Sequence, residues 1–282
     1  MKVISTVSEL THFLETCLGS QTLGFVPTMG ALHPGHLSLV QKALLQNDLV
    51  LCSIFVNPTQ FNNSEDLEKY PNRIQEDLSA LEEAGCHAVF TPSKSEIYPK
   101  NFTPKKYDFG LLEKVMEGEN RPGHFDGVAA VVSRLFDLVK PEKAYFGEKD
   151  FQQLTIIKSL VQQDCLNLEL VACPILREPD GLAMSSRNLL LLPEDRTAAA
   201  RIYSRLLHVK TLASKRSVAE IKKWVNQTFE DDPDLTLEYF EVVNTVDLQP
   251  SGKGSDHKKH VACIACFAGS IRLIDNLFIE IN

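Results

Sequence analysis

The stretch Phe25-Val26-Pro27-Thr28-Met29-Gly30-Ala31-Leu32-His33-Pro34-Gly35-His36 decides the fold. It leaves a short apolar run at 23–26, turns, and enters a segment whose apolar residues recur with helical spacing. The first turn of such a helix carries unpaired N–H groups and the positive end of the helix dipole, so it suits an anion. His33 and His36 lie on one side of that turn. We therefore predict a nucleotide site at this junction.

The glycine at position 35 would let a phosphate come close to the main chain. The His-x-Gly-His pattern is short, so a pair of surface histidines or a pair of metal ligands stays an alternative. Its place between a strand and a helix favours the nucleotide site, because open α/β sheets bind ligands there. No Walker A pattern occurs, and Gly252-x-Gly254 lacks the third glycine of a dinucleotide fingerprint.

Strand-like and helix-like segments alternate through the first 175 residues. We expect further strands at 49–56, 88–90, 143–146 and 168–175, and helices at 74–81, 128–139 and 151–161. This β-α-β order predicts an α/β fold with a Rossmann-like, doubly wound, mostly parallel sheet. The segment 91–127 has little periodicity and several prolines, and we expect a long loop of a kind that is often functional.

The pattern changes after Arg177. Two amphipathic helices are expected at 193–213 and 217–229, followed by strands at 235–243, 261–267 and 271–281. The polar stretch 251–259 has the composition of an exposed hairpin loop. We therefore predict two domains, a Rossmann-like domain at 1–176 and a smaller C-terminal α+β domain at 177–282.

Composition narrows the function classes. The hydrophobic fraction of the 282 residues is 44%, which is ordinary for a globular protein. The net charge is −8, and an acidic chain has little electrostatic attraction for nucleic acid. No apolar run is long enough to span a membrane, and the N-terminus lacks the apolar core of a secretory signal. Seven cysteines in apolar contexts indicate reduced thiols, so we expect a cytoplasmic protein without nucleic-acid or membrane partners.

A metal site built from protein ligands is not expected. Cys263 and Cys266 form a C-x-x-C pattern, but they lie in a strand-like run where positions i and i+3 face opposite ways. Neither a second such pair nor a histidine pair with metal spacing accompanies these two cysteines, so core packing is the favoured interpretation.

Polar residues follow four of the expected strands at their carboxyl ends, where an open parallel sheet binds ligands. The four clusters are Pro27, Thr28, Met29, His33 and His36; Asn57, Pro58, Thr59, Gln60 and Phe61; Gly147, Glu148, Lys149, Asp150 and Gln153; and 180–188. Each could be an ordinary turn, helix start or loop. Their convergence at one sheet edge favours a functional site over ordinary turns and loops, because hydroxyls, amides, a lysine and an arginine together suit phosphate.

Five blocks closely resemble the pantoate–β-alanine ligase family of the HIGH-motif nucleotidyltransferase superfamily. These blocks are 26–36, 53–61, 121–128, 146–153 and 177–188. They occur in order and at family-like spacing, and the block with Ser185, Ser186 and Arg187 resembles the KMSKS loop of class I aminoacyl-tRNA synthetases. The resemblance covers nearly the whole chain, although the last hundred residues match more loosely.

The resemblance implies an AMP-forming acid–amino-acid ligase. Such an enzyme joins (R)-pantoate to β-alanine with ATP, through an enzyme-held pantoyl adenylate, and gives pantothenate, AMP and diphosphate. ATP is then a substrate, and Mg²⁺ would be bound with ATP rather than in an all-protein cage. The resemblance also implies a homodimer formed through the first domain. The second domain would act as a lid that closes its serine–serine–arginine loop over ATP.

The family resemblance also assigns residues. ATP would be held by Met29, Gly30, Ala31, Leu32, His33, Pro34, Gly35, His36, Gly147, Glu148, Lys149, Asp150, Leu176, Met184, Ser185, Ser186 and Arg187. Catalytic roles would fall on His36 as proton donor and on His33, Lys149, Ser185, Ser186 and Arg187. Pantoate and β-alanine would be bound by Gln60, Gln153, Thr28 and Met29, with Asn57, Tyr70 and Arg121 as weaker candidates.

Two other functions share parts of this pattern. A cytidylyl- or adenylyltransferase of the same fold would transfer a nucleotide and stop, and it would not make an amide when β-alanine is added. A non-catalytic nucleotide-sensing or RNA-binding module is the other alternative. The acidic charge and the absence of a basic stretch interleaved with aromatic residues argue against RNA.

Overall fold

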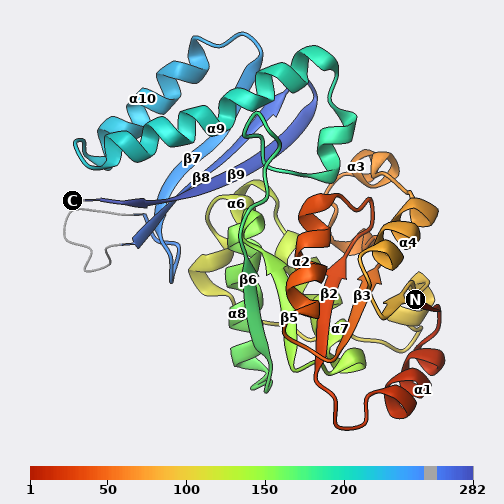
Figure 1. The fold of residues 1–282 in the computed structure, drawn as a ribbon. Coiled ribbons are helices and arrows are strands. Elements are labelled where there is room, and N and C mark those ends of the chain that lie inside the picture. Colours follow the sequence, from red (N-terminus) through yellow and green to blue (C-terminus); the bar gives the residue numbers. More distant parts are fainter. Residues whose placement is uncertain (251–258, 282) are drawn as a thin grey trace.

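The computed structural model describes residues 1–250 and 259–281. A parallel sheet in the order β1-β4-β3-β2-β5-β6 forms the first part of the molecule, and an antiparallel sheet β7-β8-β9 forms the second (Figure 1). The parallel strands are β1 (Lys2–Ile4), β2 (Leu23–Thr28), β3 (Leu49–Ile54), β4 (Ala88–Phe90), β5 (Lys143–Gly147) and β6 (Glu169–Cys173). The predicted α/β fold with a parallel sheet and a smaller α+β part is confirmed.

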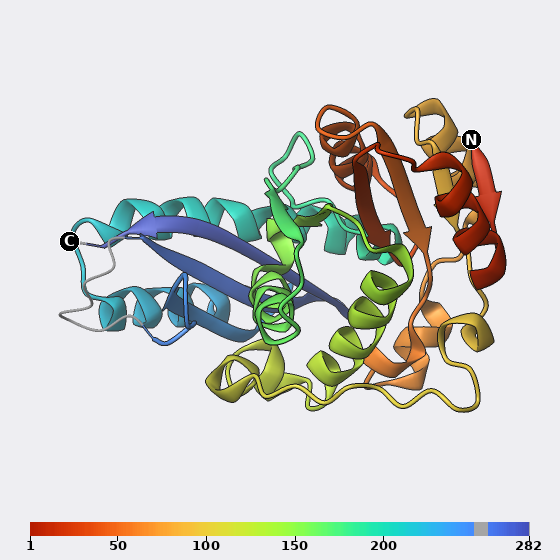
Figure 2. The same ribbon diagram turned by 90° about the horizontal axis from the view of Figure 1, so that it is seen from below.

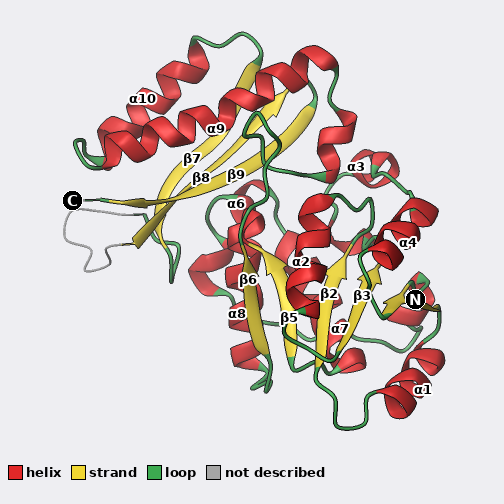
Figure 3. Cartoon of the chain, in the orientation of Figure 1, coloured by secondary structure: helices red, strands yellow, loops and turns green. Residues whose placement is uncertain are grey.

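Helices cover both faces of the parallel sheet (Figure 3). One face packs against α1 (Val7–Cys17), α7 (His124–Val139) and α8 (Phe151–Gln163), and the other against α2 (Pro34–Leu44) and α4 (Ile74–Glu83). Successive strand side chains point to opposite faces. Phe25 therefore enters the core beneath α7 and α8, whereas Val26 packs with α2. The sheet is thus doubly wound.

Strand β2 occupies the position at which the strand order reverses. It pairs with β3 on one side and with β5 on the other, all in parallel. The chain therefore winds outward from β2 to β3 and β4 and then returns to continue from β5 to β6. Crevices at such a switch point, outside the carboxyl ends of the strands, are where doubly wound sheets bind ligands.

The second part has its own apolar core. Helices α9 (Pro193–Ala213) and α10 (Val218–Glu230) cover one face of the sheet formed by β7 (Leu235–Asn244), β8 (Lys259–Ala268) and β9 (Ile271–Glu280) (Figures 1 and 2). These elements agree with the expected helices and strands. Most of the expected hairpin loop at 251–259 lies outside the described residues. The domain boundary at 176/177 stays a prediction.

Several elements were not foreseen. The first 22 residues hold β1 and α1, whose start is fixed by a capping box between Thr6 and Glu9. The expected loop at 91–127 contains short helices, and α7 begins at His124 rather than at Val128. The short elements of the first part are η1 (Pro58–Gln60), α3 (Ser64–Lys69), α5 (Lys94–Ile97), η2 (Gly110–Glu113), α6 (Glu117–Asn120) and η3 (Glu148–Asp150). Among the described residues, no helix is long and apolar enough to cross a membrane.

Candidate active site

A cavity of about 180 Å³ lies at the carboxyl ends of β2, β5 and β6. It brings together many residues that the sequence had placed in one site. These are Met29, His33, Gly35, His36, Tyr70, Gly147, Lys149, Asp150, Gln153, Leu176, Met184, Ser185, Ser186 and Arg187. Others lie outside its lining, namely Thr28, Gly30, Ala31, Leu32, Pro34, Asn57, Gln60, Arg121 and Glu148.

The two histidines of the opening turn are in direct contact. Their ring centroids are 4.0 Å apart, and the backbone N–H of His33 donates to Nδ1 of His36 at 3.4 Å. An accepting Nδ1 requires the neutral ring of His36 to carry its proton on Nε2. Burial, the ring of His36 and the charge of Lys149 lower the pKa of His33 to about 3. Burial and Lys149 lower the pKa of His36 to about 4, so both rings are neutral at neutral pH.

The need for glycine at position 35 has a cause beyond room for phosphate. A Cβ there would lie 2.8 Å from the ring of His33 and 3.5 Å from Cβ of Met184. The first distance is shorter than real Cβ contacts allow. Gly35 therefore also permits the His33 ring to fold back over the start of α2.

The loop before α2 is held by Asp77, which the sequence did not single out. Gly30 and Ala31 both have positive φ, which is unfavourable for alanine. The buried carboxylate of Asp77 accepts the N–H groups of Ala31 at 2.9 Å and of Leu32 at 2.7 Å. In the sequence Asp77 resembles an ordinary acidic residue in the first turn of a helix, so no local signal marks this role.

The loop that enters η4 (Ser186–Leu190) lies against the same turn. The hydroxyl of Ser186 donates to the carbonyl oxygen of Ala31 at 2.9 Å. The Ser185 oxygen accepts the N–H of Arg187 at 3.3 Å, which leaves its own proton available. Arg187 Nη2 lies 2.9 Å from Oδ2 of Asp66 on α3, so its guanidinium is held at the rim of the cavity.

Gln60 lies beside the cavity and its amide is oriented by neighbours. The Asn57 amide donates to Gln60 Oε1 at 3.0 Å, and Gln60 Nε2 lies 3.2 Å from the sulfur of Met29. Tyr98 in turn donates to Asn57 Oδ1 at 2.9 Å, which fixes the orientation of that amide. Thr28 uses its hydroxyl within the sheet, where it donates to the carbonyl of Ser53 at 2.7 Å.

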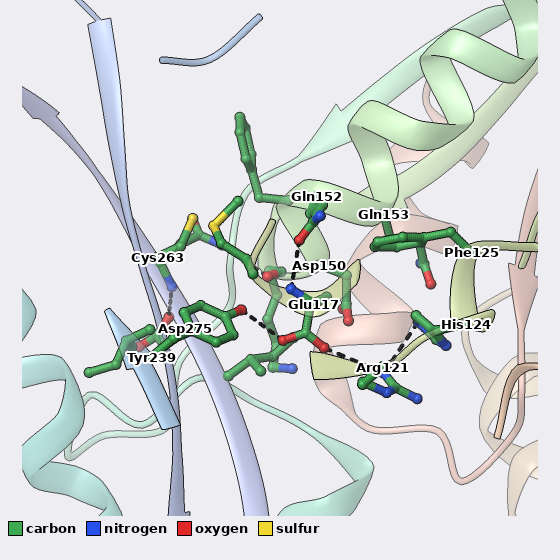
Figure 4. A pocket seen from close by; sticks show the side chains of 16 residues that line it. Glu117, Arg121, His124, Phe125, Asp150, Gln152, Gln153, Tyr239, Cys263 and Asp275 are labelled. Atoms are coloured by element: carbon green, nitrogen blue, oxygen red, sulfur yellow. Dashed lines mark hydrogen bonds and ion pairs between the residues drawn. The ribbon is translucent and has the colours of Figure 1, made fainter. Parts of the chain in front are cut away.

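A smaller cavity of about 30 Å³ adjoins the first and shares Lys149, Asp150 and Gln153 with it. Glu117 lies at its centre, where Tyr239 and Arg121 converge on its carboxylate (Figure 4). Arg272 of β9 binds the same carboxylate with two contacts of 2.7 and 3.0 Å. Burial alone would raise the pKa of Glu117, but Arg272, Tyr239 and Arg121 lower it to about 2.

This cluster is connected to Gln60 through His124. Arg121 Nη1 lies 3.2 Å from His124 Nε2, and His124 Nδ1 lies 2.8 Å from the carbonyl oxygen of Gln60. Burial, then the charge of Arg121, lower the pKa of His124 to about 4. The neutral ring therefore donates from Nδ1 to the carbonyl and accepts from the guanidinium.

The main cavity suits a polyphosphate. Lys149 and Arg187 supply positive charge, the neutral histidines supply ring N–H donors, and Ser185 supplies a hydroxyl. Among the residues that the structure describes, no group of three or more histidine, cysteine, aspartate or glutamate side chains could hold a metal ion. Cys263 and Cys266 are buried free thiols, in agreement with core packing.

Comparison with known proteins gives one consistent result. The family model described as pantoate-beta-alanine ligase matches residues 2–278. The chain is 47% identical to the pantothenate synthetase of Porphyromonas gingivalis over 281 residues, which cover 99% of this chain and 100% of that protein. It is 48% identical to the pantothenate synthetase of Bacteroides thetaiotaomicron, with 98% of each chain covered.

Two solved structures from the same family are also similar to this chain. The pantothenate synthetase of Thermus thermophilus superposes with a TM-score of 0.91 at 42% identity, covering 98% of this chain and 99% of that one. The pantoate-beta-alanine ligase of Francisella tularensis, complexed with beta-gamma ATP and beta-alanine, gives 0.82 at 36% identity, with 98% and 97% covered.

Proposed function

The chain belongs to the pantoate-beta-alanine ligase family and catalyses the ATP-dependent ligation of pantoate and β-alanine, and we propose that the cavity at the ends of β2, β5 and β6 is where it does so. The observation that supports this site is a convergence. The histidine turn, the segment 147–150 and the segment 184–187 come from distant parts of the sequence and line one cavity.

ATP occupies this cavity in the proposal. The triphosphate faces His33, His36, Lys149 and Arg187. The ribose faces Asp150, and the adenine lies against the main chain at Leu176. The proton on Nε2 of His36 makes this ring a donor to the leaving diphosphate without an imidazolium. Lys149 and Arg187 supply the charge that lets a carboxylate approach an anionic phosphate.

Pantoate lies between Gln153 and Gln60 in the proposal, next to Met29. Gln153 lines both cavities, and the Asn57 contact turns the NH₂ group of Gln60 toward Met29. That NH₂ group is a donor for the pantoate hydroxyls or carboxylate. β-Alanine then enters beside Gln60. Arg121, Asn57 and Tyr70 support these positions. Thr28 supports the turn through its hydroxyl, which accepts the N–H of Gly30 at 3.3 Å.

The reaction proceeds through pantoyl adenylate in this proposal. A carboxylate oxygen of pantoate attacks the α-phosphorus, and the bond to the β-phosphate oxygen breaks as diphosphate leaves. The β-alanine amine then attacks the acyl carbon, AMP leaves, and the amine loses its proton as the amide forms. The chain contributes mainly position and fixed dipoles, because no side chain must form a covalent bond.

We propose that Mg²⁺ is bound with ATP. Mg²⁺ usually keeps several waters and binds substrate phosphates, so it needs few protein ligands, and the described residues of the cavity offer no cage of three or more metal-binding side chains. Bound in this way, the ion neutralises phosphate charge. The residues of the cavity therefore suit an ion that arrives bound to the nucleotide.

A homodimer, a cytoplasmic location and closure of 177–282 as a lid complete the proposal. The family resemblance supports the dimer, and the free cysteines among the described residues suit a reducing compartment. Limited proteolysis tests the lid. The region between the two parts should be protected when ATP and pantoate are present, and equal cleavage with and without them would contradict closure.

The test of the site uses two assays on purified protein. Exchange of labelled diphosphate into ATP should require pantoate, and addition of β-alanine should then yield pantothenate and AMP. Lys149→Ala should abolish most of the exchange, whereas Lys158→Ala, an exposed lysine on α8, should not change it. Pantoate-independent exchange would contradict the adenylate, and an active Lys149→Ala variant would contradict the site.

A further inference from the structure

Strand β9 of the second part contacts main-chain atoms of the segment 147–150. The amide Nδ2 of Asn276 donates to the carbonyl oxygens of Glu148 at 2.8 Å and of Lys149 at 2.9 Å. Asn276 is 2% exposed, so solvent cannot replace these two bonds. The backbone on either side of the Lys149 side chain is therefore fixed by a residue more than a hundred positions away.

The chemistry of these atoms fixes the orientation of the Asn276 side chain. Carbonyl oxygens only accept hydrogen bonds, so the NH₂ group must face them. Its Oδ1 atom then points away and is buried without a hydrogen-bond partner among the described residues. In this structure Asn276 therefore acts through its N–H donors.

The residue before Asn276 binds Arg177, which lies seven positions before the other proposed ATP segment, 184–187. Arg177 and the carboxylate of Asp275 form two contacts of 2.7 and 3.0 Å, and the carboxylate is 2% exposed. The same guanidinium donates to the carbonyl of Gly181 at 3.0 Å and lies over the ring of Tyr203 at 3.7 Å. Residues 177–181 lead directly into the loop 184–187. The position of that loop therefore also depends on β9.

We propose that Asn276 and Asp275 are positioning residues for ATP, which set the segments 147–150 and 184–187 at their working separation. This inference rests on the proposed assignment of both segments to ATP. Neighbouring residues of one strand hold two segments that are connected along the chain through α8, β6 and a loop. Neither residue lines the main cavity, so both act through the segments that they hold.

The sharpest variant is Asn276→Asp, which keeps the shape of the side chain. It places carboxylate oxygens against the two carbonyls, so attraction becomes repulsion and the 147–150 segment must move. Loss of two buried hydrogen bonds should raise the KM for ATP roughly 10- to 30-fold. The KM for pantoate should stay within about twofold, since Gln60 and Gln153 are not held by Asn276.

Three further variants separate positioning from loss of stability. Asn276→Ala should raise the ATP KM less than Asn276→Asp does, because it removes the donors without adding repulsion. Arg177→Lys keeps the charge but loses the two-pronged contact with Asp275, and it too should raise the ATP KM. Leu273→Ala truncates a buried side chain of the same strand and should lower the Tm without changing the ATP KM.

A double-mutant cycle with Lys149→Ala completes the test. If Asn276 acts through the Lys149 segment, Asn276→Asp should weaken pantoate-dependent exchange much less in the Lys149→Ala background than in the wild type. An equal cost in both backgrounds, or an ATP KM that tracks Tm through all variants including Leu273→Ala, would overturn the inference. A Lys149→Ala variant with wild-type exchange would instead overturn the proposed ATP site, so the two failures are distinguishable.

Discussion

Ser186 and Ala31 lie 155 positions apart in the sequence and are joined by a hydrogen bond of 2.9 Å, from the serine hydroxyl to the alanine carbonyl. Ser186 is buried, whereas its neighbour Ser185 is half-buried with its hydroxyl proton available. Two adjacent serines that the sequence treats alike therefore have different surroundings. Ser186 is placed to close the loop on the histidine turn, and Ser185 to donate to phosphate.

We expect the two serine variants to differ. Ser186→Ala removes one hydrogen bond of about 1 kcal/mol between the loop and the turn, so it should raise the KM for ATP about fivefold with little effect on kcat. Ser185→Ala removes a donor to the reacting phosphates and should lower kcat. Steady-state kinetics with varied ATP decides this, and identical kinetic changes in both variants would contradict the distinction.

His36→Ala should lower turnover by roughly 10²- to 10³-fold, the scale for loss of one preorganised transition-state donor. The ring should matter as an Nε2 donor, because its Nδ1 already accepts the His33 N–H. His12→Ala, on the exposed face of α1, is the matched control and should leave turnover unchanged. Turnover of His36→Ala within threefold of wild type would remove this histidine from the mechanism.

The ligand-free rings of His33 and His36 should stay neutral well below pH 6. Their pKa values lie near 3 and 4, so protonation on acidification favours the unfolded chain, whose histidines titrate near 6.5. Above pH 6.5 these two rings do not change the free energy of unfolding. Below pH 6.5 they lower it, and this loss continues until the pH reaches their folded pKa values. NMR of the imidazole nitrogens checks this, and titration of either ring near 6.5 in the free protein would contradict it.

The contribution of Glu117 to stability should also be lost on acidification, but over a lower pH range. Its folded pKa near 2 is below the ordinary value of 4.5, so its contribution is present above pH 4.5 and is lost as the pH falls toward 2. The stability gap between wild type and Glu117→Gln should narrow by about 2 kcal/mol between pH 5 and pH 3. Urea unfolding at both pH values measures the gap, and a constant gap would show that Glu117 does not titrate in this range.

Gln60→Ala should mainly raise the pantoate KM, and Asn57→Asp should do the same from a distance. A carboxylate at position 57 would repel Gln60 Oε1 and turn the NH₂ group of Gln60 away from Met29. We expect both variants to raise the pantoate KM about tenfold while the ATP KM stays within twofold. Unchanged pantoate kinetics in Gln60→Ala would refute the assignment of this residue.

Much of the site could be predicted because its residues follow strands directly. The histidine turn and Lys149 each come just after a buried strand, and local pattern is enough to place them at one sheet edge. Asp77 and Asn276 could not be placed in this way. They act on backbone atoms 45 and 127 positions away, and no local pattern encodes such a pairing. A weak signal did exist for Asn276, because Asp275 and Asn276 lie between two apolar runs of β9, at 273–274 and 277–279.

The dependence on β9 has a consequence for synthesis on the ribosome. Every strand of the parallel sheet has been made once Cys173 has been added, but Asn276 follows about a hundred residues later, roughly 5–20 s at ~5–20 residues per second. A nascent chain therefore passes through an interval in which its parallel sheet can fold while the proposed ATP segments are not yet held by β9. Prematurely released chains should accumulate as compact species with no capacity to activate pantoate.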